Sequence, residues 1–380
     1  MSEQSYQICT KTVMDTSDPD IAFDKNGICH HYHEFYRRQQ MEILDGDVGR
    51  KKLEEIGESI KNETRGKDYD CIIGLSGGVD SSYVAHLVVN KLGLRPLAIH
   101  MDNGWNSELA VANIENIVKR LKIDLHTEVL DWEEYRELQK AFFKSSVGNV
   151  EMITDHAINA TLFRLTKKFG TRHIISGSNL NSEGIIQVGG WAHDNKDWVN
   201  IRDINRHFGT RSLRSYPRLS PIEFLSAVFI RKVRFIPILN YVEYNKKNAM
   251  AFLEANLGWR NYGRKHGESI FTRFFQEYYL IEKFKVDKRR SHLSSLICAG
   301  QLTREEALLE LEKEVFGDGE KDDLIEFVCK KLEFNREEWE KIMKSPPVPH
   351  TKFKTSKILS TRNHWLYRYG RKIATGRDSM

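Results

Sequence analysis

The chain has 380 residues, 40% of them hydrophobic and 29% charged, and a formal net charge of +5. This mild positive charge suits an anionic substrate such as a nucleotide without requiring nucleic acid. The sequence has no run of about 18 apolar residues, which excludes a transmembrane helix. The N-terminus lacks the apolar core of a secretory signal, so we expect a cytoplasmic location. Five widely spaced cysteines argue against a disulfide framework.

In chain order, the sequence predicts four regions. A turn-rich, ribbon-like segment that ends in a helix occupies residues 1–60, and an α/β domain occupies residues 61–240. A helical domain follows at 241–345, and a basic tail at 346–380 begins with the helix-breaking sequence PPVP. The basic tail is either a solvated segment or a docking surface for an acidic partner.

The α/β domain is predicted from short apolar runs that alternate with helix-length segments. This alternation is typical of βαβ units and of a parallel sheet covered on both faces. The expected strands are 71–75, 95–101, 124–130, 172–178 and 233–239. Val84, Leu87 and Val88 give the helix after the first strand one apolar stripe, and Gly93 is expected to end that helix.

The sequence SGGVDSS, residues 76–82, lies between the first strand and this helix, and we call it the glycine loop. Its glycines permit a tight backbone and the close approach of a ligand, and the amides at a helix N-terminus favour an anion. Asp80 is unusual in an anion site and is best explained as a Mg²⁺ ligand. The alternative is a Ser/Gly turn that caps a helix. The residues expected at the nucleotide are Ser76, Gly77, Gly78, Val79, Asp80, Ser81 and Ser82.

The order strand, Gly-Gly, Asp-Ser and helix resembles the signature of the PP-loop ATP pyrophosphatase superfamily. That superfamily includes asparagine synthetase, GMP synthetase, NAD synthetase and tRNA-thiolating enzymes. The resemblance implies a Rossmann-like fold that binds ATP and Mg²⁺, cleaves ATP between the α and β phosphates, adenylates a carbonyl-type oxygen and releases pyrophosphate. The loop lacks the Lys of GxxxxGK[ST] enzymes, which act on the γ-phosphate.

Two later loops are expected beside the glycine loop, because the carboxyl ends of parallel strands meet at one edge of a sheet. Asp102 and Asn103 follow the second strand, although Asn-Gly is also a common turn. In SGSNLNSEG, residues 176–184, the resemblance implies that Gly177, Asn179 and Glu183 face the nucleotide.

Longer blocks at 14–29, 258–284 and 287–308 resemble the N-acetyl sugar amidotransferase family of bacterial O-antigen and lipopolysaccharide biosynthesis. The resemblance implies that an acetamido group of a UDP-linked sugar becomes an acetamidino group. Separate glutaminase and cyclase-like subunits would supply the ammonia, and we expect neither a membrane nor a nucleic-acid partner.

Cationic residues in the same blocks are expected to bind anions. We assign catalytic roles to Lys265, Lys288 and Arg289, together with Asp80; the alternative is a helix surface with many charges. His266 and His292 could assist proton transfer, but we favour a structural role for both. The full cationic set is Lys265, Arg273, Lys288, Arg289 and Arg290.

The family often carries two CxxC pairs that resemble a four-thiolate zinc site. Here the pairs read CTKT and CHHY, so only Cys9 and Cys29 remain, and we do not expect zinc. Any of His30, His31 and His33 could replace a missing ligand.

Two other functions stay open. A tRNA-modifying PP-loop enzyme would favour a basic appendage and a cysteine pair near the nucleotide. A non-catalytic nucleotide-binding scaffold for the ammonia-supplying subunits is the second alternative.

Overall fold

The computed structural model describes residues 5–263 and 267–356. Its centre is a five-stranded sheet in the order β3-β2-β1-β4-β5, and every neighbouring pair is parallel. The parallel α/β sheet predicted from the sequence is therefore confirmed. The strands are β1 (Cys71–Gly74), β2 (Pro96–Asp102), β3 (Asp124–Val129), β4 (His173–Ser176) and β5 (Arg234–Pro237).

Helices cover both faces of the sheet because side chains alternate along each strand. Ile73 and Ile175 pack against one layer of helices, whereas Ile72 and Ile174 pack against the other. The first layer contains α2 (Gly46–Glu63), α3 (Val79–His86), α4 (Glu108–Leu121), η3 (Ile238–Tyr241) and α10 (Lys246–Leu257). The second contains α6 (Met152–Lys168), α9 (Pro221–Leu225) and η2 (Ser226–Ile230).

The helix predicted after the glycine loop is present as α3, which continues as the π-helical turn η1 (Leu87–Lys91). Val84 and Val88 of its apolar stripe are fully buried. The chain turns away at Gly93, whose φ of 61° lies in the left-handed region that favours glycine.

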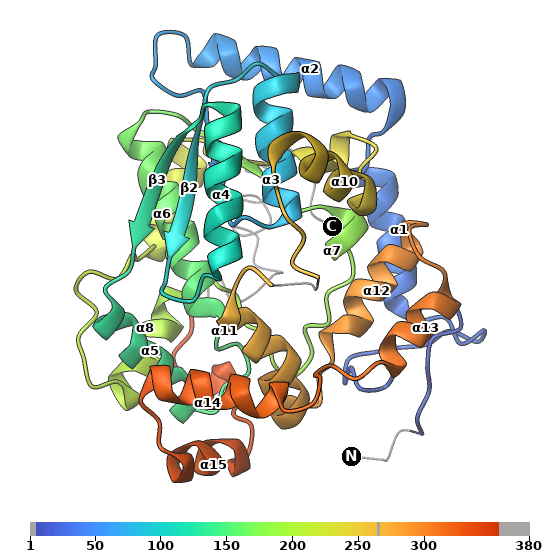
Figure 1. Cartoon of the computed structure of the whole chain (residues 1–380), viewed down its shortest axis with the longest axis vertical. Coiled ribbons are helices and arrows are strands. Elements are labelled where there is room, and N and C mark those ends of the chain that lie inside the picture. The colour runs from blue at the N-terminus through green and yellow to red at the C-terminus, as the bar shows by residue number, and fades with distance from the viewer. Residues whose placement is uncertain (1–4, 264–266, 357–380) are drawn as a thin grey trace.

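A lobe of helices lies beyond the carboxyl ends of the strands (Figure 1). Its core is aromatic and includes the fully buried Trp105, Phe143 and Phe274. The lobe places helices from the α/β region and from the C-terminal part of the chain against the same edge of the sheet. It contains α5 (Trp132–Lys144), α8 (Trp198–Phe208), α11 (Ile270–Arg273), η4 (Phe274–Phe284), α14 (Glu320–Leu332) and α15 (Arg336–Lys344).

The N-terminal segment packs beside the later helices, and Arg290 anchors it through Asp15 at 3.0 Å and the carbonyl of Val13 at 2.9 Å. Two antiparallel bridges, Ile8 to Asp15 and Phe23 to Cys29, shape the segment before α1. Its neighbours include α1 (His30–Glu42), α7 (Leu180–Glu183), α12 (Lys288–Cys298) and α13 (Arg304–Glu312).

The described start of the basic tail is anchored at His350, although most of the residues around it are exposed. In η5 (His350–Lys352), His350 is buried, and its Nδ1 lies 2.8 Å from Oδ1 of Asn200. Its Nε2 accepts a hydrogen bond of 3.2 Å from the amide of Asn149. The tail after residue 356 lies outside the described residues.

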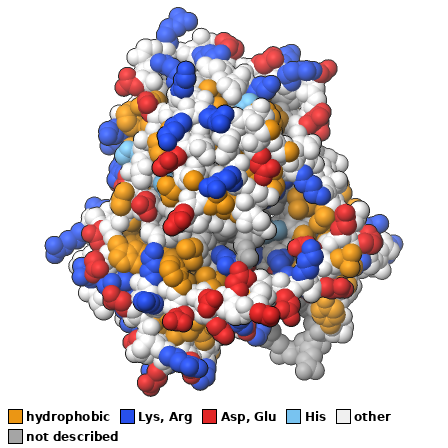
Figure 2. All heavy atoms as spheres, viewed as in Figure 1, with side chains coloured by type: hydrophobic (Ala, Val, Ile, Leu, Met, Phe, Trp, Pro, Cys, Tyr) orange, Lys and Arg blue, Asp and Glu red, His pale blue; other side chains and the backbone are white. Residues whose placement is uncertain are grey.

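Among the described residues, no helix combines the length and the apolar character that crossing a membrane would require. Acidic and basic side chains intermingle over the face shown in Figure 2.

Candidate active site

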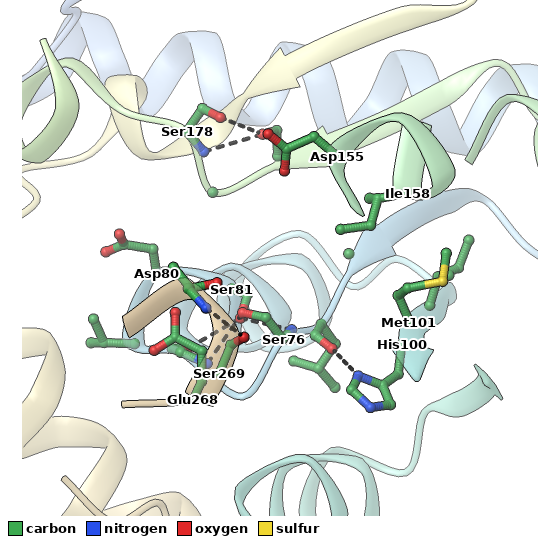
Figure 3. A pocket seen from close by; sticks show the side chains of 18 of the residues that line it. Ser76, Asp80, Ser81, His100, Met101, Asp155, Ile158, Ser178, Glu268 and Ser269 are labelled. Carbon is green, nitrogen blue, oxygen red and sulfur yellow. Dashed lines mark hydrogen bonds between the residues drawn. The ribbon is translucent and has the colours of Figure 1, made fainter. Parts of the chain in front are cut away.

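A cavity of about 460 Å³ lies at the carboxyl ends of the central strands, where the glycine loop meets the helical lobe (Figure 3). Pockets of this size hold small molecules. Its wall includes the glycine loop, the ends of β2 and β4, the start of α6, and parts of the segment 259–272. The topology therefore brings together the three loops that the sequence predicted to be neighbours.

The glycine loop has a backbone that only glycine can adopt at Gly77. Its φ is +83°, and an added Cβ would lie 2.8 Å from the carbonyl oxygen of Ala110. Gly78 precedes α3 as its N-cap and provides no side-chain cap. The amides of the first helical turn have no acceptor within the helix, so the loop fits an anionic phosphate.

The loop serines differ in their placement. Ser76 and Ser81 line the cavity, with their hydroxyl oxygens 3.2 Å apart. Val79 lines it as well. Ser82 is fully buried, and its hydroxyl has no hydrogen-bond partner within the described chain. The predicted contact residues therefore divide into cavity-lining serines and one core serine.

Asp80 faces the cavity and is held by a residue that the sequence did not single out. The hydroxyl of Tyr244 donates a hydrogen bond to Oδ1 of Asp80. Burial, and then the charge of Asp80, raises the pKa of the Tyr244 phenol, so the phenol remains a donor. Glu183 also lines the cavity, and its charge contributes to the same shift in pKa.

The donor set of Asp80 and Glu183 fits Mg²⁺, which binds through one or two carboxylates together with phosphate and water oxygens. The described residues contain no group of three or more His, Cys, Asp or Glu arranged to hold a metal. Such a site would therefore depend on phosphate oxygens for most of its ligands.

Two aromatic residues from the C-terminal half hold the glycine loop in place and also line the cavity. Nε1 of Trp259 donates a 2.7 Å hydrogen bond to the carbonyl of Gly77, and the hydroxyl of Tyr262 donates one of 2.9 Å to the same oxygen. Glu268 lies beside Gly78 in the cavity wall. A Cβ added to Gly78 would lie 3.8 Å from Oε1 of Glu268. No motif marked these residues, although they lie within the block at 258–284.

Two carboxylates form the opposite wall. Glu151 and Asp155 lie one helical turn apart at the start of α6, and both line the cavity. Burial, and then the charge of Asp155, raises the pKa of Glu151 to about 7; burial also raises the pKa of Asp155. In the sequence, only their spacing of four residues indicates that these two side chains lie on the same side of a helix.

The residues predicted after β2 and β4 also divide into some that line the cavity and some that have a structural role. Asn103 lines the cavity, whereas Asp102 accepts a 3.0 Å hydrogen bond from the amide of Gly104 and so makes the turn. Gly177 lines the cavity and packs on α3. Asn179 is buried and caps α7, because its Oδ1 accepts from the amide of Ser182 at 2.9 Å.

The predicted cations that the structure describes have different partners. Lys288 lies 5.2 Å from the ring of Trp191, and its charge lowers the pKa of both Glu151 and Asp155. Arg289 is held by Asp287 at 2.8 Å and by the carbonyl of Lys313 at 2.9 Å.

Two of the other predicted cations make ion pairs outside the cavity. Arg273 pairs with Glu277 at 2.9 Å and with Glu320 at 2.7 Å, and Arg290 pairs with Asp15. His292 lies in α12, outside the described cavity wall. Lys265 and His266 lie outside the described residues. Lys246, at the start of α10, is the one Lys or Arg among the described residues of the cavity wall.

The N-terminal cysteines pack in a small apolar core. Cys9 and Cys29 are fully buried, and Sγ of Cys9 accepts a 3.2 Å hydrogen bond from the amide of Cys29. Thr12 replaces a ligand and lies 3.7 Å from the Cys29 sulfur. Of the possible substitutes, His31 is bound to Asp18 at 2.7 Å and His33 to Asp24 at 3.0 Å.

Residues 52–168 match the family described as NAD synthase. Together with the parallel sheet and the glycine loop, this match defines a PP-loop α/β protein. Residues 268–368 match the family described as LPS biosynthesis protein WbpG-like, C-terminal domain. The chain thus carries an NAD synthase-like domain of the PP-loop superfamily and a WbpG-like C-terminal domain. The two matches support a nucleotide-using, amidotransferase-like role.

Over 131 residues, the chain is 31% identical to an uncharacterized protein of Methanocaldococcus jannaschii. That match covers 34% of this chain and 45% of the relative. An NH3-dependent NAD synthetase from Campylobacter jejuni aligns at 15% identity with a TM-score of 0.33, over 79% of this chain and 98% of that one. An NMN synthetase from Francisella tularensis aligns at 14% identity with a TM-score of 0.27, over 54% of this chain and 87% of that one.

Proposed function

We propose that the protein is an ATP-dependent amidotransferase that acts on a UDP-linked N-acetyl sugar in O-antigen or lipopolysaccharide biosynthesis. It adenylates the oxygen of an acetamido group, and ammonia then replaces that oxygen to give an acetamidino sugar, AMP and pyrophosphate. A diacetamido uronic acid is the sugar that we propose. Separate glutaminase and cyclase-like subunits would deliver the ammonia.

One observation carries this proposal: the first residues of the WbpG-like domain form a wall of the cavity that holds the glycine loop. Glu268, Ser269 and Thr272 lie at the start of the match at 268–368, and all three line the cavity. The amide of Ser107 also donates a 3.0 Å hydrogen bond to the carbonyl of Glu268, which ties this segment to the loop after β2. The glycine loop and the WbpG-like domain thus line one cavity, which supports a single reaction that uses both.

The residues of the chain can be assigned to this reaction by their chemistry. The first-turn amides of α3, with Ser76, Ser81 and Lys246, would bind phosphate oxygens. Asp80 and Glu183 would hold Mg²⁺, which neutralises phosphate charge as pyrophosphate leaves. Adenylation is needed because an amide carbonyl is a poor electrophile and AMP is a better leaving group than oxide.

A tRNA-thiolating function is less well supported. The described residues of the cavity wall include no cysteine. Cys71 is buried in β1, and burial raises its pKa, which disfavours a reactive thiolate.

The test supplies ATP, Mg²⁺, ammonium chloride and a UDP-linked diacetamido uronic acid, and follows nucleotide and sugar products by chromatography and mass spectrometry. We expect AMP, pyrophosphate and a sugar in which one oxygen has become an NH group. ADP and phosphate as products would contradict the mechanism. ATP binding without turnover would favour the scaffold alternative.

A further inference from the structure

We infer that Glu151 and Asp155 together accept the proton that an incoming ammonium ion must lose to become the nucleophile, and that the charge of Lys288 tunes this carboxylate pair. The inference rests on the proposed function and adds the residues that serve its second half-reaction. In this inference, the nucleophile is deprotonated at the cavity wall that lies across from the glycine loop.

The placement of the pair is the first argument. In Figure 3, Asp155 lies across the cavity from Ser76, Asp80 and Ser81 of the glycine loop. A substrate amide held between the two walls would be adenylated from the loop side. The nucleophile would then approach from the α6 side, opposite the departing AMP.

The hydrogen bonds of the pair are the second argument. The hydroxyl of Thr272 donates to Oε1 of Glu151, and Nδ2 of Asn195 lies 3.4 Å from Oδ2 of Asp155. Gln276 donates to Glu151 as well. These neutral donors fix the orientation of both carboxylates, and no Lys or Arg of the described residues makes a direct ion pair with either one, so each keeps acceptor capacity for a proton or a cation.

The chemistry of the second step needs such a group. The lone pair of ammonia forms a C–N bond to the imidate carbon, the C–O bond to AMP breaks, and AMP leaves with that electron pair. Ammonium has no lone pair, so a nucleophile that arrives as ammonium has to lose one proton first. A carboxylate oxygen of the pair accepts this proton and later releases it to solvent.

The charges around the pair suit a base that works near neutral pH. The pKa of Glu151, raised to about 7 by burial and by Asp155, would be higher still without Lys288. Other groups that act on the pair or feel its charge are Lys196 before α8, Tyr135 on α5 and Tyr216 before α9. Glu268 and Glu183 belong to the glycine-loop side of the cavity and are not part of the pair.

The test separates the two half-reactions in Glu151→Gln and Asp155→Asn. Isotope exchange between pyrophosphate and ATP, with sugar but without ammonium, reports adenylation. Amidine formation as a function of ammonium concentration and pH reports the second step. Glu134→Gln is the matched control, because Glu134 is a buried carboxylate bound to Ser215 and lies outside the described cavity wall.

We expect each variant to retain exchange and to lose amidine formation by about 10²-fold or more at neutral pH. The deficit should shrink above the pKa of ammonium, where free ammonia needs no base. Glu134→Gln should behave as the parent protein does. Unchanged ammonium-dependent rates in both variants, or an equal loss of exchange and amidine formation, would overturn the inference.

The pH–rate profile of Lys288→Met distinguishes an electrostatic role of Lys288 from a purely structural one. Loss of its positive charge raises the pKa of the pair, so the acid limb of the pH–rate profile should shift to higher pH. Lys313→Met, which removes an exposed lysine paired with Glu310, should leave the profile in place. An unshifted profile in Lys288→Met would remove Lys288 from the inference. A parent protein that shows neither exchange nor amidine formation would overturn the proposed function itself, and this inference with it.

Discussion

Nε1 of Trp259 donates a 2.7 Å hydrogen bond to the carbonyl oxygen of Gly77, which lies 182 residues earlier in the chain. The bond is buried, and Trp259 also lines the cavity beside the glycine loop. Tyr262 donates to the same oxygen at 2.9 Å. The loop that would bind the phosphates is thus held in shape by a segment that leads into the WbpG-like domain.

Gly77→Ala should abolish nucleotide binding, because its φ of +83° is strained for alanine and the new Cβ would meet the Ala110 carbonyl at 2.8 Å. Gly66→Ala is the matched control, since Gly66 has a φ of +82° but nothing within 4 Å of an added Cβ. The control should lose about 1–2 kcal/mol of stability and keep its affinity for nucleotide. Calorimetric titration with an ATP analogue and urea unfolding test both variants. Equal affinity in the two would contradict the close packing of the loop.

Trp259→Phe should weaken nucleotide binding by up to about tenfold, because losing one hydrogen bond costs about 1 kcal/mol and loosens the loop. Trp339→Phe is the control, since its indole Nε1 lies 3.4 Å from the hydroxyl of Tyr278 in the helical lobe. That variant should lose stability but retain affinity. The same titration distinguishes them, and an unchanged affinity in Trp259→Phe would show that Tyr262 suffices.

The stability of the protein should fall as the pH drops from about 6.5 towards 4. Burial lowers the pKa of His156 to about 4, while an unfolded histidine titrates near 6.5, about its ordinary value. Between these values the unfolded state binds a proton that the folded state does not, so acid favours unfolding. The ring donates to the carbonyl of Asn195 at 2.8 Å and accepts from the amide of Leu219 at 3.1 Å, which leaves no room for a second ring proton.

Urea unfolding at pH 7, 6 and 5 checks this dependence. His156→Gln should be less stable at pH 7 but should lose less stability on acidification. Burial also lowers the pKa of His350, so this residue should preserve part of the dependence of stability on pH. If the stability of His156→Gln depended on pH as strongly as that of the parent protein, His156 would be excluded as a cause.

Lys331→Met should loosen α14 from the loop after β2. Nζ of Lys331 donates to the carbonyl of Gly104 and lies 4.8 Å and 5.2 Å from the rings of Trp105 and Trp132. Methionine keeps the apolar stem but loses both interactions, at a cost of about 1–2 kcal/mol. Lys330→Met, at an exposed position next to it, should cost little. Hydrogen exchange of the α14 amides would show the difference, and equal exchange in the two variants would refute it.

The strands, the glycine loop and the helix after it were predicted correctly from the sequence because their signals are local. Alternation of apolar runs, two glycines and the stripe of Val84 and Val88 each lie within a short window. The start of α13 is fixed by a local signal of the same kind, because Thr303 and Glu306 form a capping box there.

The remaining cavity residues could not be predicted in this way. Glu151 and Asp155 lie at the start of α6 with no motif around them, and only the tertiary structure, in which Thr272 of α11 donates to Glu151, places both in the cavity wall. Asn179 was expected at the nucleotide, but its side chain caps α7 instead, because an Asn before a short helix satisfies its first amides.

By itself, the sequence determined that this protein has a parallel sheet with a glycine loop at the end of its first strand. Backbone conformation and alternating hydrophobicity are properties of neighbouring residues, so they can be read in order. Only the tertiary structure decided which distant side chains surround that loop. Contacts such as those of Trp259 with Gly77 and Tyr244 with Asp80 join residues more than 150 positions apart, and their formation depends on the packing of the whole core.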